Sequence, residues 1–233
     1  MENAKKNVKE WIQSGGLYIV LALLLIIIIA KEPSFLSIRN FRNILTQSSV
    51  RLIMALGVAG LIVTQGTDLS AGRQVGLVAV ISATLLQHIN NVNKVFPNLG
   101  EVPIIVVILI GALIGALMGL FNALLVAQFK VTPFIATLGT MIIVYGINSL
   151  YFDSVGASPI AGFDPRYTNF AQGFFDIGGF RLPFLILYAL TAVFIVWVIW
   201  NKTTFGKNIF AIGGNPEAAK VSGVNVKKNL FAV

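Results

Sequence analysis

The chain has 233 residues, of which 56% are hydrophobic and only 11% are charged, and its mean hydropathy is +0.84. An ordinary soluble domain carries about 25% charged residues, so this composition leaves too little polar surface to face water. The apolar residues also fall in long blocks instead of the alternations or stripes of a soluble core. These features exclude a soluble globular protein and predict an all-α, polytopic transmembrane helical bundle.

The net charge of +8 comes from 17 lysine and arginine residues against nine acidic residues. A basic chain can attract nucleic acid, but here no basic cluster is interleaved with aromatic residues. In a membrane protein, basic residues set the orientation and meet anionic headgroups. We therefore expect a lipid bilayer as a partner and no nucleic acid. Cysteine is absent, which excludes a thiolate metal site, and we expect neither a metal nor a cofactor.

Six apolar segments approach the length of about 20 residues that a helix needs to cross a bilayer core of about 30 Å. They are Leu17–Ala30, Leu52–Val63, Val75–Leu86, Pro103–Phe129, Thr132–Phe152 and Pro183–Trp200. Only the last three span comfortably. Lysines precede the first segment as in a secretory signal, but a charged pair and a proline follow it where a cleavage site needs small residues, so we expect an uncleaved span.

The distribution of basic residues predicts the orientation of these spans. A cytoplasmic N-terminus places residues 201–229 and their five lysines inside, as the positive-inside rule requires. The segment Asp153–Arg181 then lies outside. Residues 31–51 disagree, because their basic side chains would also lie outside. Either Phe35–Val50 is an interfacial helix or the number of spans before it is wrong.

The second and third apolar segments are short and are separated by the polar stretch Thr64–Gln74. Neither segment spans a bilayer unaided. In transporters, short or glycine-interrupted segments are often discontinuous helices that line a polar pathway. We expect Asp68 or Ser70 to cap the second half and Asp68 to pair with Arg73. A plain turn between two helices with polar flanks explains the stretch about equally well.

Polar residues in or beside the spans are candidates for a translocation pathway, although an interhelical hydrogen bond is the simpler interpretation of each. These candidates are Thr64, Gln65, Asp68, Ser70, Asn122, Tyr145 and Asn148. A separate pattern consists of Gly111, Gly115 and Gly119, which recur every four residues and continue at Ala123 and Ala127. Small residues in line on one helix face predict close packing against a neighbouring helix.

The segment Asn215–Gly223 has the pattern of a short helix with both ends marked. Asn215 suits the N-cap, Pro216 the first helical position, and Glu217 the positive end of the helix dipole. Gly223 suits the left-handed conformation that ends a helix. We expect the small residues Ala218, Ala219 and Val221 on its surface, where a helix that buries little by itself could insert into a groove on a partner.

Several stretches resemble the ribose/xylose/galactose class of permeases from ATP-binding-cassette (ABC) sugar importers. The resemblance covers nearly the whole chain, and the Asp-Leu-Ser-x-Gly element is specific to this class. The stretches are Ile44-Leu45-Thr46-Gln47-Ser48-Ser49, Gln65-Gly66-Thr67-Asp68-Leu69-Ser70-Ala71-Gly72, Thr132-Pro133-Phe134-Ile135-Ala136-Thr137-Leu138-Gly139-Thr140 and Phe205-Gly206-Lys207-Asn208-Ile209-Phe210-Ala211-Ile212-Gly213-Gly214-Asn215-Pro216. In the same class, Glu-Ala-Ala followed by three residues and glycine forms the cytoplasmic loop that contacts the ATPase.

This resemblance implies a permease that is not itself an enzyme and carries a monosaccharide, galactose or methyl galactoside, across the bacterial inner membrane. Its implied partners are a cytoplasmic ABC ATPase, a periplasmic sugar-binding protein and a second permease copy. Residues 1–233 would form one permease domain, with residues 201–229 as the coupling loop. Members of the class continue with further spans, so we expect this chain to be C-terminally incomplete. A secondary transporter of a small polar solute is the alternative.

Overall fold

The computed structural model describes residues 2–233, with side chains from residue 15 onward except that of Ile177. Within this part, four helices are long and apolar enough to cross a membrane, and two apolar helical segments, Gly15–Lys31 and Ala71–Leu85, are shorter. All six predicted spans are therefore helical. The long helices are α2 (Ile38–Val63), α4 (Ile104–Ala123) with its π-helical continuation η2 (Leu124–Gln128), α5 (Pro133–Ser154) and α7 (Phe184–Lys202). The predicted all-α class is confirmed, with one small β-hairpin added.

Helix α2 corrects the prediction for residues 35–63. Instead of an interfacial helix followed by a short span, one continuous helix of 26 residues follows a 3-10 turn, η1 (Pro33–Leu36). The side chain of Ser37 caps α2 by accepting from Asn40 N at 3.2 Å. At 1.5 Å per residue, α2 is about 39 Å long and exceeds the bilayer core. In contrast, α3 (Ala71–Leu85) has only 15 residues. Of the two short apolar segments on either side of the polar stretch, only the second therefore forms a short helix.

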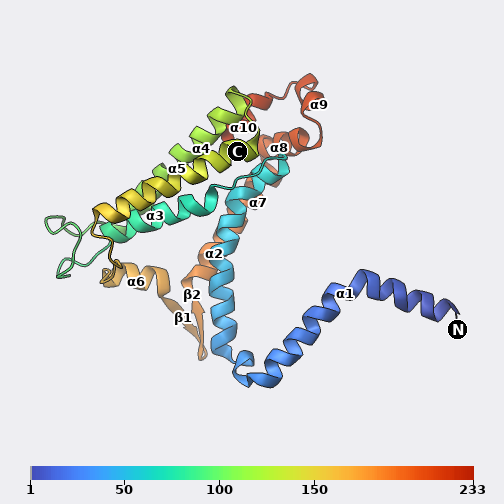
Figure 1. Cartoon of the computed structure of the whole chain (residues 1–233), viewed down its shortest axis with the longest axis horizontal. Coiled ribbons are helices and arrows are strands. Elements are labelled where there is room, and N and C mark those ends of the chain that lie inside the picture. The colour runs from blue at the N-terminus through green and yellow to red at the C-terminus, as the bar shows by residue number, and fades with distance from the viewer. Residues whose placement is uncertain (1) are drawn as a thin grey trace.

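The helices form two packed groups that meet at one end of the molecule (Figure 1). In one group α3 lies against α4 and α5, and in the other α2 lies against α7. The helices α8 (Thr204–Gly214) and α10 (Val226–Ala232) lie where the groups meet, and α9 (Pro216–Val221) projects beyond them. The helix α1 (Glu2–Lys31) extends away from the rest, and most of its apolar side chains between Leu17 and Ile28 are exposed.

The opposite end of the α3–α5 group carries two long connections, residues 86–103 and 155–183. The second contains α6 (Pro165–Gln172) and the antiparallel hairpin of β1 (Phe174–Ile177) and β2 (Phe180–Pro183). Gly178 and Gly179 both have positive φ angles, 58° and 87°, as a two-residue hairpin turn requires. The sequence predicted only that residues 153–181 lie outside, and gave no sign of this helix or hairpin.

Hydrogen bonds and ion pairs join these two connections into one unit. Asp164 N donates to Leu86 O at 2.9 Å, and the amide of Gln87 donates to Ala161 O at 3.1 Å. Arg166 then bridges Asp164 and Glu101, with 2.7 Å from its Nη2 to one oxygen of each carboxylate. The two connections are thus held together at the end of the bundle away from α8–α10.

The Asp164–Arg166 pair predicts a specific pH dependence of stability. The hydrogen-bonded guanidinium of Arg166 lowers the pKa of Asp164 from 3.8 to about 2. Because the unfolded carboxyl binds its proton at higher pH than the folded one, the stability from this pair is complete above pH 3.8 and is lost as the pH falls toward 2. Asp164→Asn keeps a capping oxygen and removes the charge, so we expect it to cost at most about 1 kcal/mol at neutral pH.

Thermal unfolding of the purified protein measures this cost as a function of pH. The difference in Tm between the wild type and Asp164→Asn should be constant near neutral pH and shrink below pH 3.8. Glu101→Gln removes the more exposed partner of Arg166 and serves as the control, with a smaller expected effect. A Tm difference that is the same at all pH values would rule out the charged pair as its cause.

Candidate translocation and coupling sites

The connection between α2 and α3, residues 64–70, is a short and polar segment that we call the break. After α2 ends, Gln65 adopts a positive φ of 61° and Gly66 N donates to Leu61 O at 2.8 Å. The Asp68 carboxylate then accepts from Ser70 N at 2.7 Å and from the Ser70 hydroxyl at 2.6 Å. Asp68 thereby orders the backbone immediately before α3, and Ser70 occupies the N-cap position without a capping side-chain bond.

The predicted pair between Asp68 and Arg73 is wrong. Both hydrogen bonds of Asp68 go to Ser70, whereas the Arg73 guanidinium lies over the ring of Tyr145, 4.6 Å from its centroid. A cation over an aromatic face is attracted by the ring quadrupole. Arg73 therefore links α3 to α5 and does not neutralise Asp68.

A chain of buried side-chain hydrogen bonds connects the break to α4 and α5. Ser70 is fully buried, and its Oγ accepts from the amides of Gln74 at 2.8 Å and Asn122 at 3.0 Å. Asn122 Oδ1 in turn accepts from the hydroxyl of Thr140 at 2.6 Å. Buried polar groups are stable only when they are paired, so these contacts hold the break in one position. We call Asp68, Ser70, Gln74, Asn122 and Thr140 the polar network.

Thr137 fixes the same break from α5. Its hydroxyl lies 3.3 Å from Thr67 O and accepts from Leu69 N at 3.2 Å. The sequence interpretation included Thr137 and Thr140 only as part of a matching stretch and assigned them no role. Their spacing of three residues places both on one face of α5, which was the available signal.

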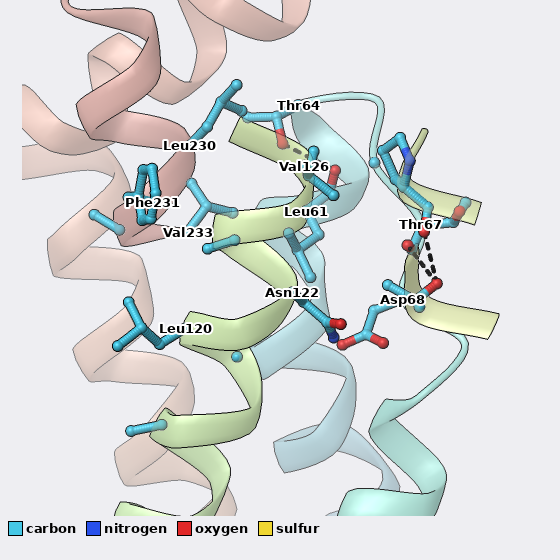
Figure 2. Close-up of a pocket in the computed structure, with 17 residues that line it drawn as sticks. Leu61, Thr64, Thr67, Asp68, Leu120, Asn122, Val126, Leu230, Phe231 and Val233 are labelled. Atoms are coloured by element: carbon cyan, nitrogen blue, oxygen red, sulfur yellow. Dashed lines mark hydrogen bonds between the residues drawn. The ribbon is translucent and has the colours of Figure 1, made fainter. Parts of the chain in front are cut away.

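Beside the polar network lies a cavity of about 590 Å³ (Figure 2). Its walls come from the end of α2, the break, α4 with η2, the start of α5, and α10. Most of the lining is apolar, and Figure 2 shows the Asp68 carboxylate and the Asn122 amide close together at the edge of this space. The polar lining side chains are Thr64, Thr67, Asp68, Asn122 and Thr137.

The structure brings together only some of the predicted pathway residues. Thr64, Asp68 and Asn122 line the cavity, and Ser70 lies behind them in the polar network. Gln65 instead donates from Nε2 to Gly213 O at the end of α8, at 2.9 Å. Tyr145 and Asn148 lie further along α5 and are not in the wall of this cavity. Asn148 Oδ1 is buried and accepts no hydrogen bond within the described part of the chain.

The three glycines predicted to lie on one helix face have different surroundings in the structure. A Cβ atom at Gly111 would lie 2.8 Å from Val78 Cγ1, so α3 and α4 approach closely there, as expected. A Cβ atom at Gly115 or Gly119 would have no such neighbouring atom within 4 Å. Both instead border a second, mostly apolar cavity of about 1030 Å³ between α2, α3 and α4. Close packing therefore does not hold at these two glycines among the described residues.

Helix α9 has caps at both ends. The Asn215 side chain accepts from Glu217 N at 3.0 Å and from Ala218 N at 3.1 Å, and Pro216 occupies the first turn. At the other end Gly223 has a φ of 85°, Gly223 N donates to Lys220 O and Val224 N donates to Ala219 O, each at 3.0 Å. This pair of bonds is the Schellman motif. The helix predicted here is present, with the caps expected at both ends.

The predicted surface of α9 needs one correction. Ala218 and Val221 are exposed, Val221 by 89%, but Ala219 is only 4% exposed because the helix folds back toward α8. Glu217 and Lys220 are also exposed. The free surface of α9 is thus a mixed patch of charged and small apolar side chains, held on a rigid turn outside the spans.

Long apolar helices, a polar break beside a cavity and a capped helix outside the spans together define a helical membrane permease. The chain belongs to the family described as the permease component of the branched-chain amino acid transport system, whose model matches residues 40–233. By this family, the chain is the permease component of a transport system. The family does not support the alternative of a secondary transporter.

Curated relatives narrow the comparison further. The galactose/methyl galactoside import permeases of Salmonella typhimurium and Escherichia coli K12 are each 66% identical to this chain over 229 residues. Those residues cover 98% of this chain and 68% of each relative. The ribose import permease of Bacillus subtilis is 36% identical over 218 residues, which cover 93% of this chain and 62% of that relative. No solved structure matches the chain.

Proposed function

We propose that this chain is the membrane-spanning subunit of a bacterial inner-membrane importer for galactose or methyl galactoside. The observation that carries the proposal is the 66% identity to two galactose/methyl galactoside import permeases over 98% of this chain. The lower identity to a ribose permease, 36%, favours galactose over ribose. In this proposal the N-terminus and α8–α10 lie in the cytoplasm, and the hydrogen-bonded connections 86–103 and 155–183 lie outside.

The proposed importer has three partners. A cytoplasmic ATPase binds the exposed patch of α9, a periplasmic binding protein delivers the sugar to the outer connections, and a second copy of the permease completes the channel. The caps of α9 support the first contact, since a helix whose ends are fixed can transmit a push without unwinding. Asn215, Pro216, Glu217, Ala218 and Gly223 form or end this docking element, and Ala219 anchors it.

The proposed sugar pathway passes the polar network. A sugar hydroxyl both donates and accepts hydrogen bonds. Thr64, Asp68 and Asn122 offer both kinds of group at one cavity, and Ser70 lies behind them. Apolar walls with a few convergent polar groups are typical of small-molecule sites. Tyr145 and Asn148, which lie away from this cavity, are weaker candidates for the pathway.

Uptake in cells tests the proposed substrate. Because the chain covers 68% of the length of the Salmonella relative, the sharpest test is a chimera in which this chain replaces the matching 229 residues of that protein. In a strain that lacks its own galactose permease, the chimera should restore uptake of labelled galactose, and excess methyl galactoside should compete more strongly than ribose. Stronger competition by ribose, or a well-expressed chimera without galactose uptake, would contradict the proposal.

A further inference from the structure

The end of α8 is joined directly to the break between α2 and α3. Gln65 Nε2 donates to Gly213 O at 2.9 Å, a contact between residues 148 positions apart in the chain. A Cβ atom at Gly213 would lie only 2.0 Å from Val63 O, so the two backbones touch where any larger residue would separate them. The contact between α8 and the break is therefore close and depends on a glycine.

Beyond its contact with the break, α8 continues directly into α9. Asn215 N donates to Ala211 O at 3.1 Å while its side chain caps α9, so the end of α8 and the start of α9 share one residue. Ile209 and Ile212 of α8 are each 2% exposed, and Ala219 of α9 is buried as well. Because α8 and α9 share Asn215 and pack against each other, we expect a displacement of α9 to move the end of α8.

In the other direction, the residues of the break that follow Gln65 reach the wall of the cavity. Thr67 O and Leu69 N both contact the Thr137 hydroxyl, and Asp68 and Ser70 belong to the polar network. Gln65 holds a positive φ of 61°, a conformation that a non-glycine residue adopts at some cost and keeps only when its surroundings fix it. The hydrogen bond to Gly213 is the side-chain contact that fixes it from α8.

We propose that Gln65 is a coupling residue, which transmits movement of α8 and α9 to the break that lines the cavity. This inference rests on the proposed docking of an ATPase at α9. It replaces the sequence interpretation of Gln65 as a sugar-contacting residue. The contact between Gly213 and Val63 is not a hydrogen bond, so the Gln65 donor supplies the directional link between the end of α8 and the break.

These 233 residues contain no cysteine, so a thiol introduced among them gives a direct test. Thr67→Cys places a single thiol on the break, and its rate of reaction with a charged thiol reagent reports how open the break is. The rate is measured in the complete permease–ATPase complex with and without a nonhydrolysable ATP analogue. We expect ATP analogue to change the rate by about fivefold in the Thr67→Cys parent and by less than about 1.5-fold after Gln65→Leu, which lacks the donor.

Two further variants separate coupling from a merely structural role. Gln65→Lys restores a side-chain donor and should restore the response. Gln47→Leu, at an exposed glutamine of α2 that lies 18 positions before Gln65, should leave the response intact. A permease that fails to bind the ATPase contradicts the proposed function itself. If the ATPase binds, two results overturn the role of Gln65. One is a thiol reaction rate in the Thr67→Cys parent that does not change with the ATP analogue, and the other is a change of rate that persists in Gln65→Leu.

Discussion

Replacement of Glu217 by lysine together with Ala218 by tryptophan is expected to abolish ATP-driven sugar uptake while the permease stays folded in the membrane. Both side chains are exposed on α9, and the groups that hold the helix, the Asn215 cap and buried Ala219, are untouched. Charge reversal and added bulk at the centre of a small docking surface typically cost more than about 2 kcal/mol of binding free energy. We therefore expect uptake to fall by more than about tenfold.

The measurement pairs initial uptake rates with ATP hydrolysis in the same membranes. The double variant should lose stimulation of ATP hydrolysis by sugar-loaded binding protein, and its Tm should match that of the wild type. Glu32→Lys, the same charge reversal at an exposed residue between α1 and η1, is the control and should transport normally. Normal galactose uptake by the double variant would count decisively against docking at α9.

The same substitution at two asparagines, Asn122 and Asn148, is expected to have opposite effects on stability. Asn122 donates to Ser70 and accepts from Thr140 in the polar network, whereas Asn148 Oδ1 is buried without a hydrogen bond in the described structure. Asn122→Leu removes the hydrogen bonds to Ser70 and from Thr140, although the Thr140 hydroxyl keeps Ala136 O as an acceptor at 3.1 Å. We expect it to lower the free energy of unfolding by about 1–2 kcal/mol. Asn148→Leu removes an unpaired polar atom and should be neutral or stabilising.

Thermal unfolding in detergent compares the two variants directly, because the substitution is the same and both sites lie in spans. We also expect Asn122→Leu to lose transport, since the break loses its anchor to α4. A matched pair of threonines checks the explanation: Thr140→Val removes a donor to Asn122, whereas Thr191→Val removes one bonded only to its own helix at Leu187 O. Equal Tm values for the two asparagine variants would show that the polar network does not stabilise the fold.

The features that could be predicted from the sequence are those encoded locally. The caps of α9 depend on residues within three or four positions of each other, and Asn215 and Gly223 both have the predicted roles. Span positions follow from the length of apolar runs, and all six are helical. The boundary of α2 was missed because the arginines and asparagines between Arg39 and Arg51 interrupt the apolar run and suggested a separate interfacial helix, although they lie in one continuous helix.

The rest depends on contacts between distant residues, which no single-sequence pattern specifies. Asp68 and Arg73 have the spacing of an ion pair. In the fold, however, the Arg73 guanidinium lies over the Tyr145 ring and the Asp68 carboxylate accepts from Ser70. In the same way Gln65 looks like a pathway residue until the fold brings Gly213 beside it. The side-chain chemistry of the site could be predicted, but its partners could not.

Transport by the reconstituted chimera tests the central claim most directly. The chimera and its ATPase are placed in proteoliposomes, with ATP inside, sugar-loaded binding protein outside and no ion gradient. We predict accumulation of labelled galactose that requires both ATP and the binding protein and is lost in the Glu217→Lys, Ala218→Trp variant. If galactose accumulates only after an ion gradient is imposed, and does so without ATP, the assignment of this chain as the permease of an ATP-driven importer is contradicted.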